Sequence, residues 1–419
     1  MAIRRQGLLY KRLTESRTVP YVGAEIENAV IMREAIPEDT VVVFYHKTLD
    51  GHCVWLLDKN GIREFESLKV SDAVAPLLLR LFYESEKIDA AQLLRQPLRK
   101  SAVAQSMSEA NNETIQFEIR HEPILETMRR FLFPGNLSEL ISEYDRAVIV
   151  PYEQLGTFPF AAIPIGQNTY LFETTKIKIA PSLIDLVGRE MWHVGNSSYE
   201  GYHRVSPRCS NVQDLPSTSS SVAEWTALII GDPDYSEDPE FSMPQLEGAK
   251  KEAIDVARIF GAEALIGESA TLPRVEASIG SANLLYFASH GISYSENGLQ
   301  GFLALSGGAR LTAATVQRMC LKRAQIAVLS ACQTGLGQTV GGGTIGLARA
   351  FQIAGVNDVV MSLWNVDDEA TRFLMTTFSR RIRSGDSAEG ALQFAMTETR
   401  AVHPSPAKWA SFLIFSSEF

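Results

Sequence analysis

The pattern of apolar and polar positions differs between the two halves of the chain. In the second half, short apolar runs alternate with longer stretches in which apolar residues recur every three or four positions. Short apolar runs bounded by turn residues indicate buried strands, and the wider spacing indicates amphipathic helices. Strands that alternate with helices form parallel sheets covered by helices on both faces. We expect strands in ALIIGDP, LLYFASHG, IAVLSACQTG and DVVMSLWNVDD.

The first half is predicted to be rich in hairpins. The runs TVVVFY and CVWLL flank the turn-rich HKTLDGH, and another turn follows at Asn60 and Gly61. Alternating runs joined by such turns are typical of β-hairpins. Helical spacing covers residues 70–88 and 123–133, and RAVIV and TTKIKIAPS indicate two further strands.

Between the halves lies a polar stretch without apolar periodicity. Residues 193–221 are rich in Ser, Gly and Pro, which is typical of a flexible linker. The sequence therefore predicts an N-terminal region over residues 1–192, a linker over 193–221 and a second domain over 222–419. No repeat of fixed period is visible, which argues against a solenoid.

Composition and charge exclude several classes of protein. The net charge of −10 disfavours direct binding to nucleic acid, because like charges repel phosphates. No apolar run has the length of a membrane span, and the first residues lack a signal peptide, so we expect a cytoplasmic protein without membrane contact. The four cysteines are spread out without a CxxC pair, which predicts neither a metal site nor a disulfide framework.

One glycine-rich run imitates a nucleotide-binding motif. GGGTIG contains the spacing Gly341-x-Gly343-x-x-Gly346. A pyrophosphate-binding turn must follow its strand at once, whereas these glycines begin well beyond the predicted strand end at Ser330. We therefore expect no cofactor.

Reactive side chains follow three of the predicted strands. His290 ends FASHG, Cys332 lies in LSACQTG, and Asp367 and Asp368 follow SLWN, which ends with Asn365. The carboxyl ends of parallel strands meet at one edge of a sheet, where functional residues gather. We therefore expect these groups to share one edge.

A histidine beside a cysteine can perform nucleophilic catalysis. The imidazole of His290 would take the proton of Cys332 and make the sulfur a nucleophile. The backbone N–H groups of Gly291 and Cys332 would stabilise the oxyanion of the tetrahedral intermediate. Considered alone, His290 could be a strand-end residue satisfied by the backbone, and Cys332 could be a small buried apolar residue.

These motifs together resemble the CHAT family, caspase-like cysteine peptidases related to separase. The resemblance is carried by FASHG, LSACQTG, GDPDY with LEGAKKEA, VIVPYEQLGTFPFAAIP and PAKWASFLIF. It implies an α/β caspase-like fold with a mostly parallel sheet flanked by helices, and an N-terminal, degenerate caspase-like half packed against the catalytic half. It also implies a dyad of His290 and Cys332.

The resemblance extends to a substrate pocket. In separase-like relatives an Asp after the third-strand tryptophan reads a basic side chain before the scissile bond, and Asp368 stands at the matching place with Asp367 beside it. Ser330 is a candidate pocket wall. The alternative for both aspartates is N-capping of the helix that begins with EATRFLM.

The motifs and the resemblance together imply a cysteine endopeptidase with regulated activation that cuts a protein partner after a basic residue, and an activating protein partner is a candidate for the regulation. A catalytically silent CHAT scaffold and a thiol hydrolase acting on small molecules remain alternatives. Self-cleavage near Arg204 or Arg208 in the linker is a further expectation, because exposed polar segments are cut readily.

Overall fold

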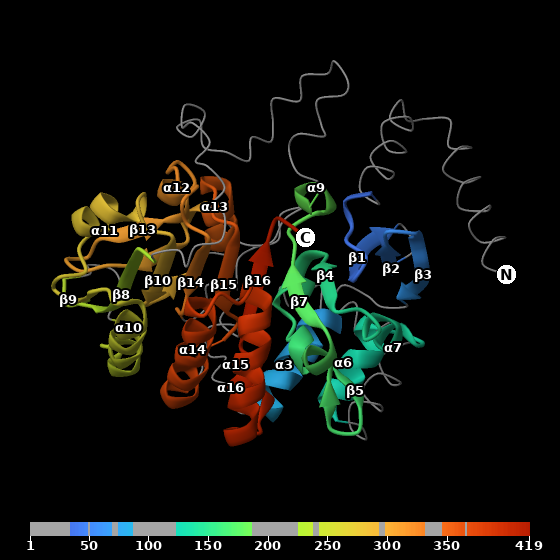
Figure 1. The fold of residues 1–419 in the computed structure, drawn as a ribbon. Coiled ribbons are helices and arrows are strands. Elements are labelled where there is room, and N and C mark those ends of the chain that lie inside the picture. Colours follow the sequence, from blue (N-terminus) through green and yellow to red (C-terminus); the bar gives the residue numbers. More distant parts are fainter. Residues whose placement is uncertain are drawn as a thin grey trace, which may run out of the picture.

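One continuous sheet joins the two halves of the chain (Figure 1). The structure, a computed structural model, describes residues 34–48, 51–68, 74–86, 123–186, 225–237, 243–292, 298–331, 346–364 and 367–419. Within them, eleven strands pair in the order β3-β2-β1-β4-β7-β16-β15-β14-β10-β8-β9. Their bounds are β1 Thr40–Thr48, β2 Gly51–Asp58, β3 Gly61–Leu68, β4 Arg146–Val150, β7 Lys176–Ile179, β8 Ala227–Pro233, β9 Ala264–Gly267, β10 Leu284–Ala288, β14 Ile326–Leu329, β15 Asp358–Ser362 and β16 Phe412–Ser416.

The hairpins predicted in the first half are confirmed. β1 pairs antiparallel with β2, and β2 pairs antiparallel with β3. Gly61 adopts φ +116°, a conformation that glycine accepts without steric cost, at the turn between β2 and β3. β1 then pairs parallel with β4, and β4 with β7, so the hairpins extend a small parallel sheet.

The second half is the predicted parallel sheet with one reversed strand. β9, β8, β10, β14 and β15 are parallel neighbours in that order. β16 runs antiparallel to β15 but parallel to β7 of the first half. Strand direction therefore reverses between β15 and β16, both of the second half, and not between β16 and β7, where the two halves meet. The fold class predicted from the sequence, α/β with a mostly parallel sheet flanked by helices, is confirmed.

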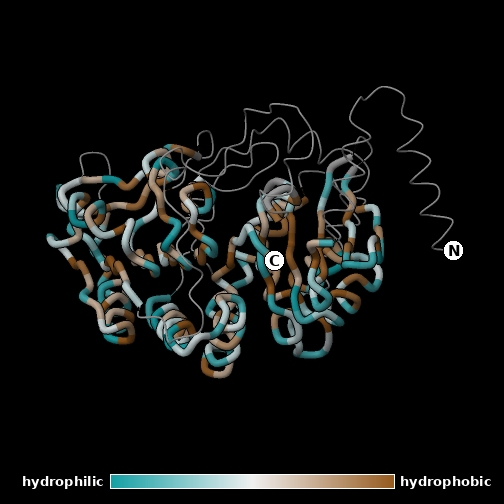
Figure 2. The backbone as a smooth tube through the Cα atoms, turned by 45° about the horizontal axis from the view of Figure 1, so that its top comes forward, coloured by the Kyte–Doolittle hydropathy of each residue, from teal (hydrophilic) through white to brown (hydrophobic). Residues whose placement is uncertain are grey.

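Helices cover both faces of the sheet in the second half. In Figure 1, α10, α14, α15 and α16 gather on one side, and α11, α12 and α13 on the other. In Figure 2 the strands carry long apolar stretches, while hydrophilic positions recur along the helices. Glycine follows two of these helices, with Gly261 at φ +66° after α10 and Gly355 at φ +111° after α13. The bounds are α10 Glu247–Phe260, α11 Leu272–Ile279, α12 Ala313–Val316, α13 Gly346–Ala354, α14 Asp368–Arg383, α15 Ala388–Val402 and α16 Pro406–Trp409.

The first half also has its own helices and a two-stranded sheet. The predicted helices at 70–88 and 123–133 are found as α3 and α6. The bounds are α3 Val74–Ser85, α6 Ile124–Leu132, α7 Leu137–Ile141, α8 Leu171–Thr174, α9 Leu183–Leu186, β5 Pro164–Gly166 and β6 Thr169–Tyr170.

Aromatic residues and buried charges hold the halves together. Phe82 and Tyr83 of α3 pack on Trp364, with ring centroids 5.5 and 5.8 Å away. Oε1 of the buried Glu389 on α15 lies 3.7 Å from Nζ of Lys178 on β7, which is also buried. The same oxygen lies 3.3 Å from Nε of Arg146 on β4. These ion pairs connect strands of the first half to a helix of the second.

Some features were not expected from the sequence. A three-stranded antiparallel sheet follows His290, and its strands have only two or three residues, too few to show alternation. They are β11 Gly291–Ile292, β12 Phe302–Ala304 and β13 Arg310–Thr312. Cys320 is disulfide-bonded, whereas the cysteine spacing predicted no disulfide framework. The spacing of cysteines along a chain does not report their distance in space.

Several expectations fall on residues outside the described part of the chain. These are the predicted linker 193–221 and two of the site residues, Cys332 and Asn365. Within the described ranges, no helix is long and apolar enough to cross a membrane. No cluster of three potential metal ligands occurs there either.

Candidate active site

Strand register brings the ends of β10 and β14 side by side. The first four residues of β10 each pair with the residue 42 positions later in β14, from Leu284 with Ile326 to Phe287 with Leu329. Both strands are fully buried. His290 stands two residues beyond the end of β10, and Ser330 directly follows β14. The structure thus brings His290 and Ser330 to one edge of the sheet.

A backbone carbonyl fixes the imidazole of His290. Nε2 of the ring lies 2.8 Å from the carbonyl oxygen of Pro244. A carbonyl oxygen can only accept, so Nε2 carries a hydrogen and donates it. In the neutral ring, Nδ1 is then the unprotonated nitrogen. The ring also packs edge-on against Tyr235, with centroids 4.8 Å apart, so its orientation is defined from two sides.

Burial keeps this imidazole neutral. It lowers the pKa of His290 below the ordinary value of 6.5 and is the largest influence on it. The Pro244 carbonyl and the negative charge of Asp232 act in the opposite direction but are weaker. A neutral ring with an unprotonated Nδ1 is suited to act as a general base near neutral pH.

Asp232, which the sequence did not single out, lies next to this histidine. It is the last residue but one of β8 and is buried, and its Oδ1 accepts the backbone N–H of Leu246 at 2.6 Å. Its backbone φ is +43°, a left-handed conformation that Asp tolerates better than most residues. Burial raises the pKa of its carboxyl group.

A second buried carboxylate connects the two strands. Glu252 of α10 accepts a hydrogen bond of 2.6 Å from the hydroxyl of Tyr286 on β10. Ser330 hydrogen-bonds to the same side chain. Burial raises the pKa of Glu252 to about 7. The signal that could have revealed it is its position: Glu252 falls on the inward face of α10 with Gly248, Val256 and other buried residues.

Asp367 and Asp368 have different roles in the structure. Asp367 is the N-cap of α14, and its side chain accepts from the N–H groups of Glu369 and Ala370. Its other carboxylate oxygen lies 3.0 Å from Nζ of Lys408. The capping alternative is therefore observed for Asp367. Asp368 is exposed, and its carboxylate lies against Gly248, where an added Cβ would come within 2.2 Å of Cγ of Asp368.

The remaining members of the expected site are placed only in part. Gly291 is buried and begins β11, paired with Leu303. Cys332 lies outside the described residues; the residue before it, Ala331, accepts a hydrogen bond of 2.7 Å from the hydroxyl of Ser362 at the end of β15. This bond fixes the backbone immediately before the cysteine.

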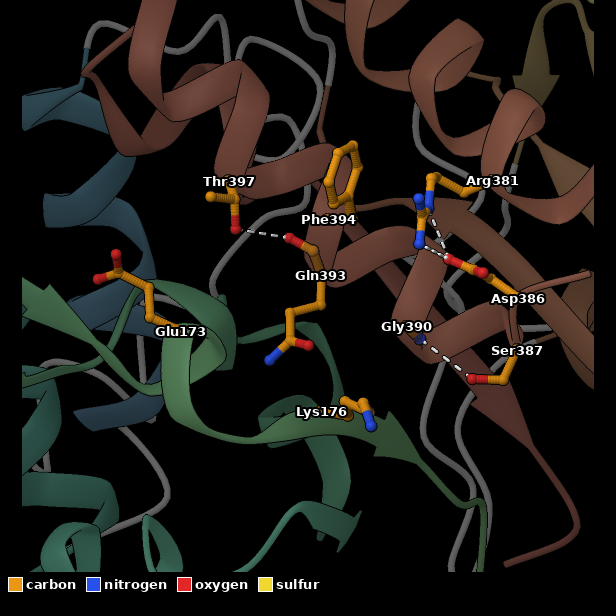
Figure 3. A pocket seen from close by; sticks show the side chains of 9 residues that line it. All are labelled: Glu173, Lys176, Arg381, Asp386, Ser387, Gly390, Gln393, Phe394 and Thr397. Atoms are coloured by element: carbon orange, nitrogen blue, oxygen red, sulfur yellow. Dashed lines mark hydrogen bonds and ion pairs between the residues drawn. The ribbon is translucent and has the colours of Figure 1, made fainter. Parts of the chain in front are cut away.

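A pocket elsewhere on the molecule has a different character (Figure 3). It is lined by α8, the start of β7, the end of α14, the segment that joins α14 to α15, and α15 itself. Its charged lining residues pair with other residues: Arg381 with Asp386, Lys176 with Asp145, and Glu173 with Arg400. Because these charges are already compensated, the pocket offers little to select a charged ligand, and it contains none of the predicted site residues.

The comparisons with known proteins agree with this architecture. Tetratricopeptide repeat protein 28 from Homo sapiens is 24% identical over 324 residues, which is 66% of this chain but 12% of that protein. The mouse protein matches equally. The chain thus corresponds to a small part of these curated relatives.

Separase shares this fold at low sequence identity. Separase in the Saccharomyces cerevisiae separase–securin complex superimposes with a TM-score of 0.53 and 13% identity, over 94% of this chain and 31% of separase. The Arg-specific cysteine proteinase gingipain R gives a TM-score of 0.39 and 10% identity, over 73% of this chain and 67% of the proteinase. The separase match shows that the fold is caspase-like. The CHAT domain matches residues 122–417, so the chain belongs to the CHAT domain family.

Proposed function

We propose that this chain is a cysteine endopeptidase in which His290 is the general base and Cys332 the nucleophile. The observation that carries the proposal is the strand register. β10 and β14 pair residues that are 42 positions apart, and Cys332 follows His290 by the same 42 positions. Two residues that continue neighbouring parallel strands at matching positions are expected at the same edge.

The chemistry follows from the tautomer of His290. With Nε2–H held by Pro244, Nδ1 accepts the proton of the Cys332 thiol, and the thiolate attacks the carbonyl carbon of the scissile peptide bond. The backbone N–H groups of Gly291 and Cys332 donate to the oxyanion. When the C–N bond breaks, the imidazolium returns the proton to the leaving amine. Water then hydrolyses the thioester and regenerates the thiol.

The substrate class is a protein with a basic residue before the scissile bond. Asp368 is the proposed carboxylate for that side chain, because it is exposed beside Gly248. Ser330 is the proposed pocket wall. Asp367 contributes by fixing the start of α14, since both of its carboxylate oxygens are engaged.

Regulation by a protein partner is also part of the proposal. The separase with a similar fold was solved together with securin. By analogy, we propose that a partner protein controls the activity of this chain. The cytoplasmic location expected from the sequence stays a prediction.

Mapping of cleavage sites by mass spectrometry tests the proposal. A proteome treated with the wild-type protein should acquire new termini after Arg or Lys, and Cys332→Ala or His290→Ala should produce none. Cys53→Ala is the matched control, because Cys53 is a free and buried thiol. An electrophilic peptide with Arg at its reactive end should label Cys332 alone. Cleavage retained by Cys332→Ala would refute the assignment, and a protein without adduct or cleavage would be a scaffold.

A further inference from the structure

The loop that supplies the Pro244 carbonyl is itself held by a buried carboxylate. Asp232 accepts the N–H of Leu246 at 2.6 Å, and Leu246 is the N-cap residue of α10. Pro244 stands two residues earlier and presents its carbonyl oxygen to His290 at 2.8 Å. The contact at Leu246 therefore fixes the loop from which His290 receives its orientation.

The backbone of Asp232 supports a specific local role. Within the described residues, Asn168 and Asp232 are the non-glycine positions with positive φ. Such conformations cost free energy and persist where the surrounding structure fixes them, often at functional sites. Asp232 also lies at the carboxyl end of β8, the strand beside β10, at the edge where His290 lies.

The charge of Asp232 acts on the same histidine. It favours the protonated form of His290, against the stronger effect of burial. Charged groups of α10 face this carboxylate as well, Glu247 with like charge and Lys250 with opposite charge. The aromatic ring of Tyr235 covers another side of the imidazole. Asp232 is thus the acidic side chain that acts on His290 within the described chain.

We propose that Asp232 is a positioning residue for His290. Through Leu246 it holds the Pro244 carbonyl against Nε2, and its negative charge stabilises the imidazolium that carries the thiol proton to the leaving amine. The role of the negative charge in stabilising the imidazolium deepens the proposed peptidase function and rests on it. The contact between Asp232 and the His290 loop does not depend on catalysis.

An NMR titration of His290 in the full-length protein tests the electrostatic part. Asp232→Asn keeps an oxygen acceptor for Leu246 and tolerates the same backbone conformation, but removes the charge. We expect the titration midpoint of His290 to fall by about 0.5 pH units or more. Asp234→Asn is the control, because that carboxylate is exposed and bonds Ser236. An unchanged His290 midpoint in Asp232→Asn would overturn the electrostatic role.

Kinetics with Asp232→Ala test the positioning part. This variant lacks both charge and acceptor, and kcat should fall at least tenfold with KM within about twofold, as for loss of a transition-state interaction. Asp232→Asn should recover part of the loss, and equal kcat values for the two variants would contradict positioning through Leu246. If Asp232→Ala does not fold, the Leu246 amide resonance of the wild type should shift with the ionisation of Asp232. The NMR results stand even if no substrate is ever cleaved, so failure of the inference and of the proposed function can be told apart.

Discussion

The hydroxyl group of Tyr286 donates a hydrogen bond of 2.6 Å to Oε1 of Glu252, and both side chains are buried. The pair links the strand that leads to His290 with the helix that covers it. Ser330, at the end of the neighbouring strand, bonds to the same carboxyl group. A single titratable group therefore contacts both of the strands that lead to the candidate site.

Glu252 should make the stability of the protein depend on pH. Burial raises its pKa from 4.5 to about 7, so the folded protein binds this proton more tightly than the unfolded chain. The stabilisation is complete below about pH 4.5 and is lost as the pH rises through about 7, a change of roughly 3 kcal/mol. Glu252→Gln should flatten this dependence in urea unfolding between pH 5 and 8. Glu276→Gln, at an exposed position of α11, should not, and equal curves for both variants would contradict the assignment.

Tyr235 should set the pH below which the reaction of Cys332 with an electrophilic peptide slows. Since burial is the main cause of the lowered pKa of His290, labelling of Cys332 by an electrophilic peptide should fall off only below about pH 6.5. Tyr235→Ala should expose the imidazole of His290 to water and so raise the pKa of His290. The loss of labelling at acidic pH should then begin at a higher pH. Tyr235→Phe keeps the aromatic contact and should leave this pH near its wild-type value. An unchanged pH for the loss of labelling in Tyr235→Ala would argue against burial by this ring.

Substitutions of Asp367 and Asp368 should have different effects, on stability and on cleavage specificity respectively. Asp368→Asn should reduce cleavage after Arg by about tenfold or more, as expected for losing a charge-assisted hydrogen bond of about 1.5–3 kcal/mol, without lowering the melting temperature. Asp367→Ala removes the N-cap of α14 and should cost about 1 kcal/mol of stability. Cleavage-site profiling and thermal unfolding of both variants measure the two effects. A specificity change confined to Asp367→Ala would reverse the assignment.

Gly248 should be required for the position of Asp368. A Cβ at residue 248 would lie 2.2 Å from Cγ of Asp368, and contacts below 3.0 Å force a displacement. Gly248→Ala should therefore weaken the preference for basic residues in the same direction as Asp368→Asn. Gly390→Ala is a matched control on α15, where the added atom would lie 3.3 Å from Oγ of Ser387. An unaltered cleavage profile in Gly248→Ala would indicate that Asp368 does not read the substrate.

Lys178 should be essential for joining the halves. Lys178→Met leaves the buried Glu389 with one partner fewer, and breaking a buried ion pair typically costs about 3–5 kcal/mol. Lys176→Met, two residues earlier on β7, breaks a more exposed pair with Asp145 and should cost less than about 1 kcal/mol. Denaturant unfolding measures both. Similar losses in the two variants would show that the buried pair contributes little.

Local patterns in the sequence were sufficient for much of the fold. The apolar runs before His290 and Ser330 are long enough to identify strands, and the Asn60–Gly61 turn identifies a hairpin. Direction and pairing are less visible: nothing in FLIFS shows that β16 runs antiparallel to β15. The contact between Asp232 and Leu246 joins the end of β8 to the start of α10 and leaves no periodic signal. Glu252 left a weak signal, a charged residue in phase with the buried positions of α10.

The location of β16 bears on what a proteolytic cut would do. This strand comes late in the chain, yet it lies in the interior of the sheet between β7 and β15, and Phe415 pairs with Ile179. The segment that joins the halves in sequence, between Leu186 and Trp225, is therefore not what joins them in space. A molecule nicked there should elute from a sizing column as one species and resolve into two fragments only after denaturation.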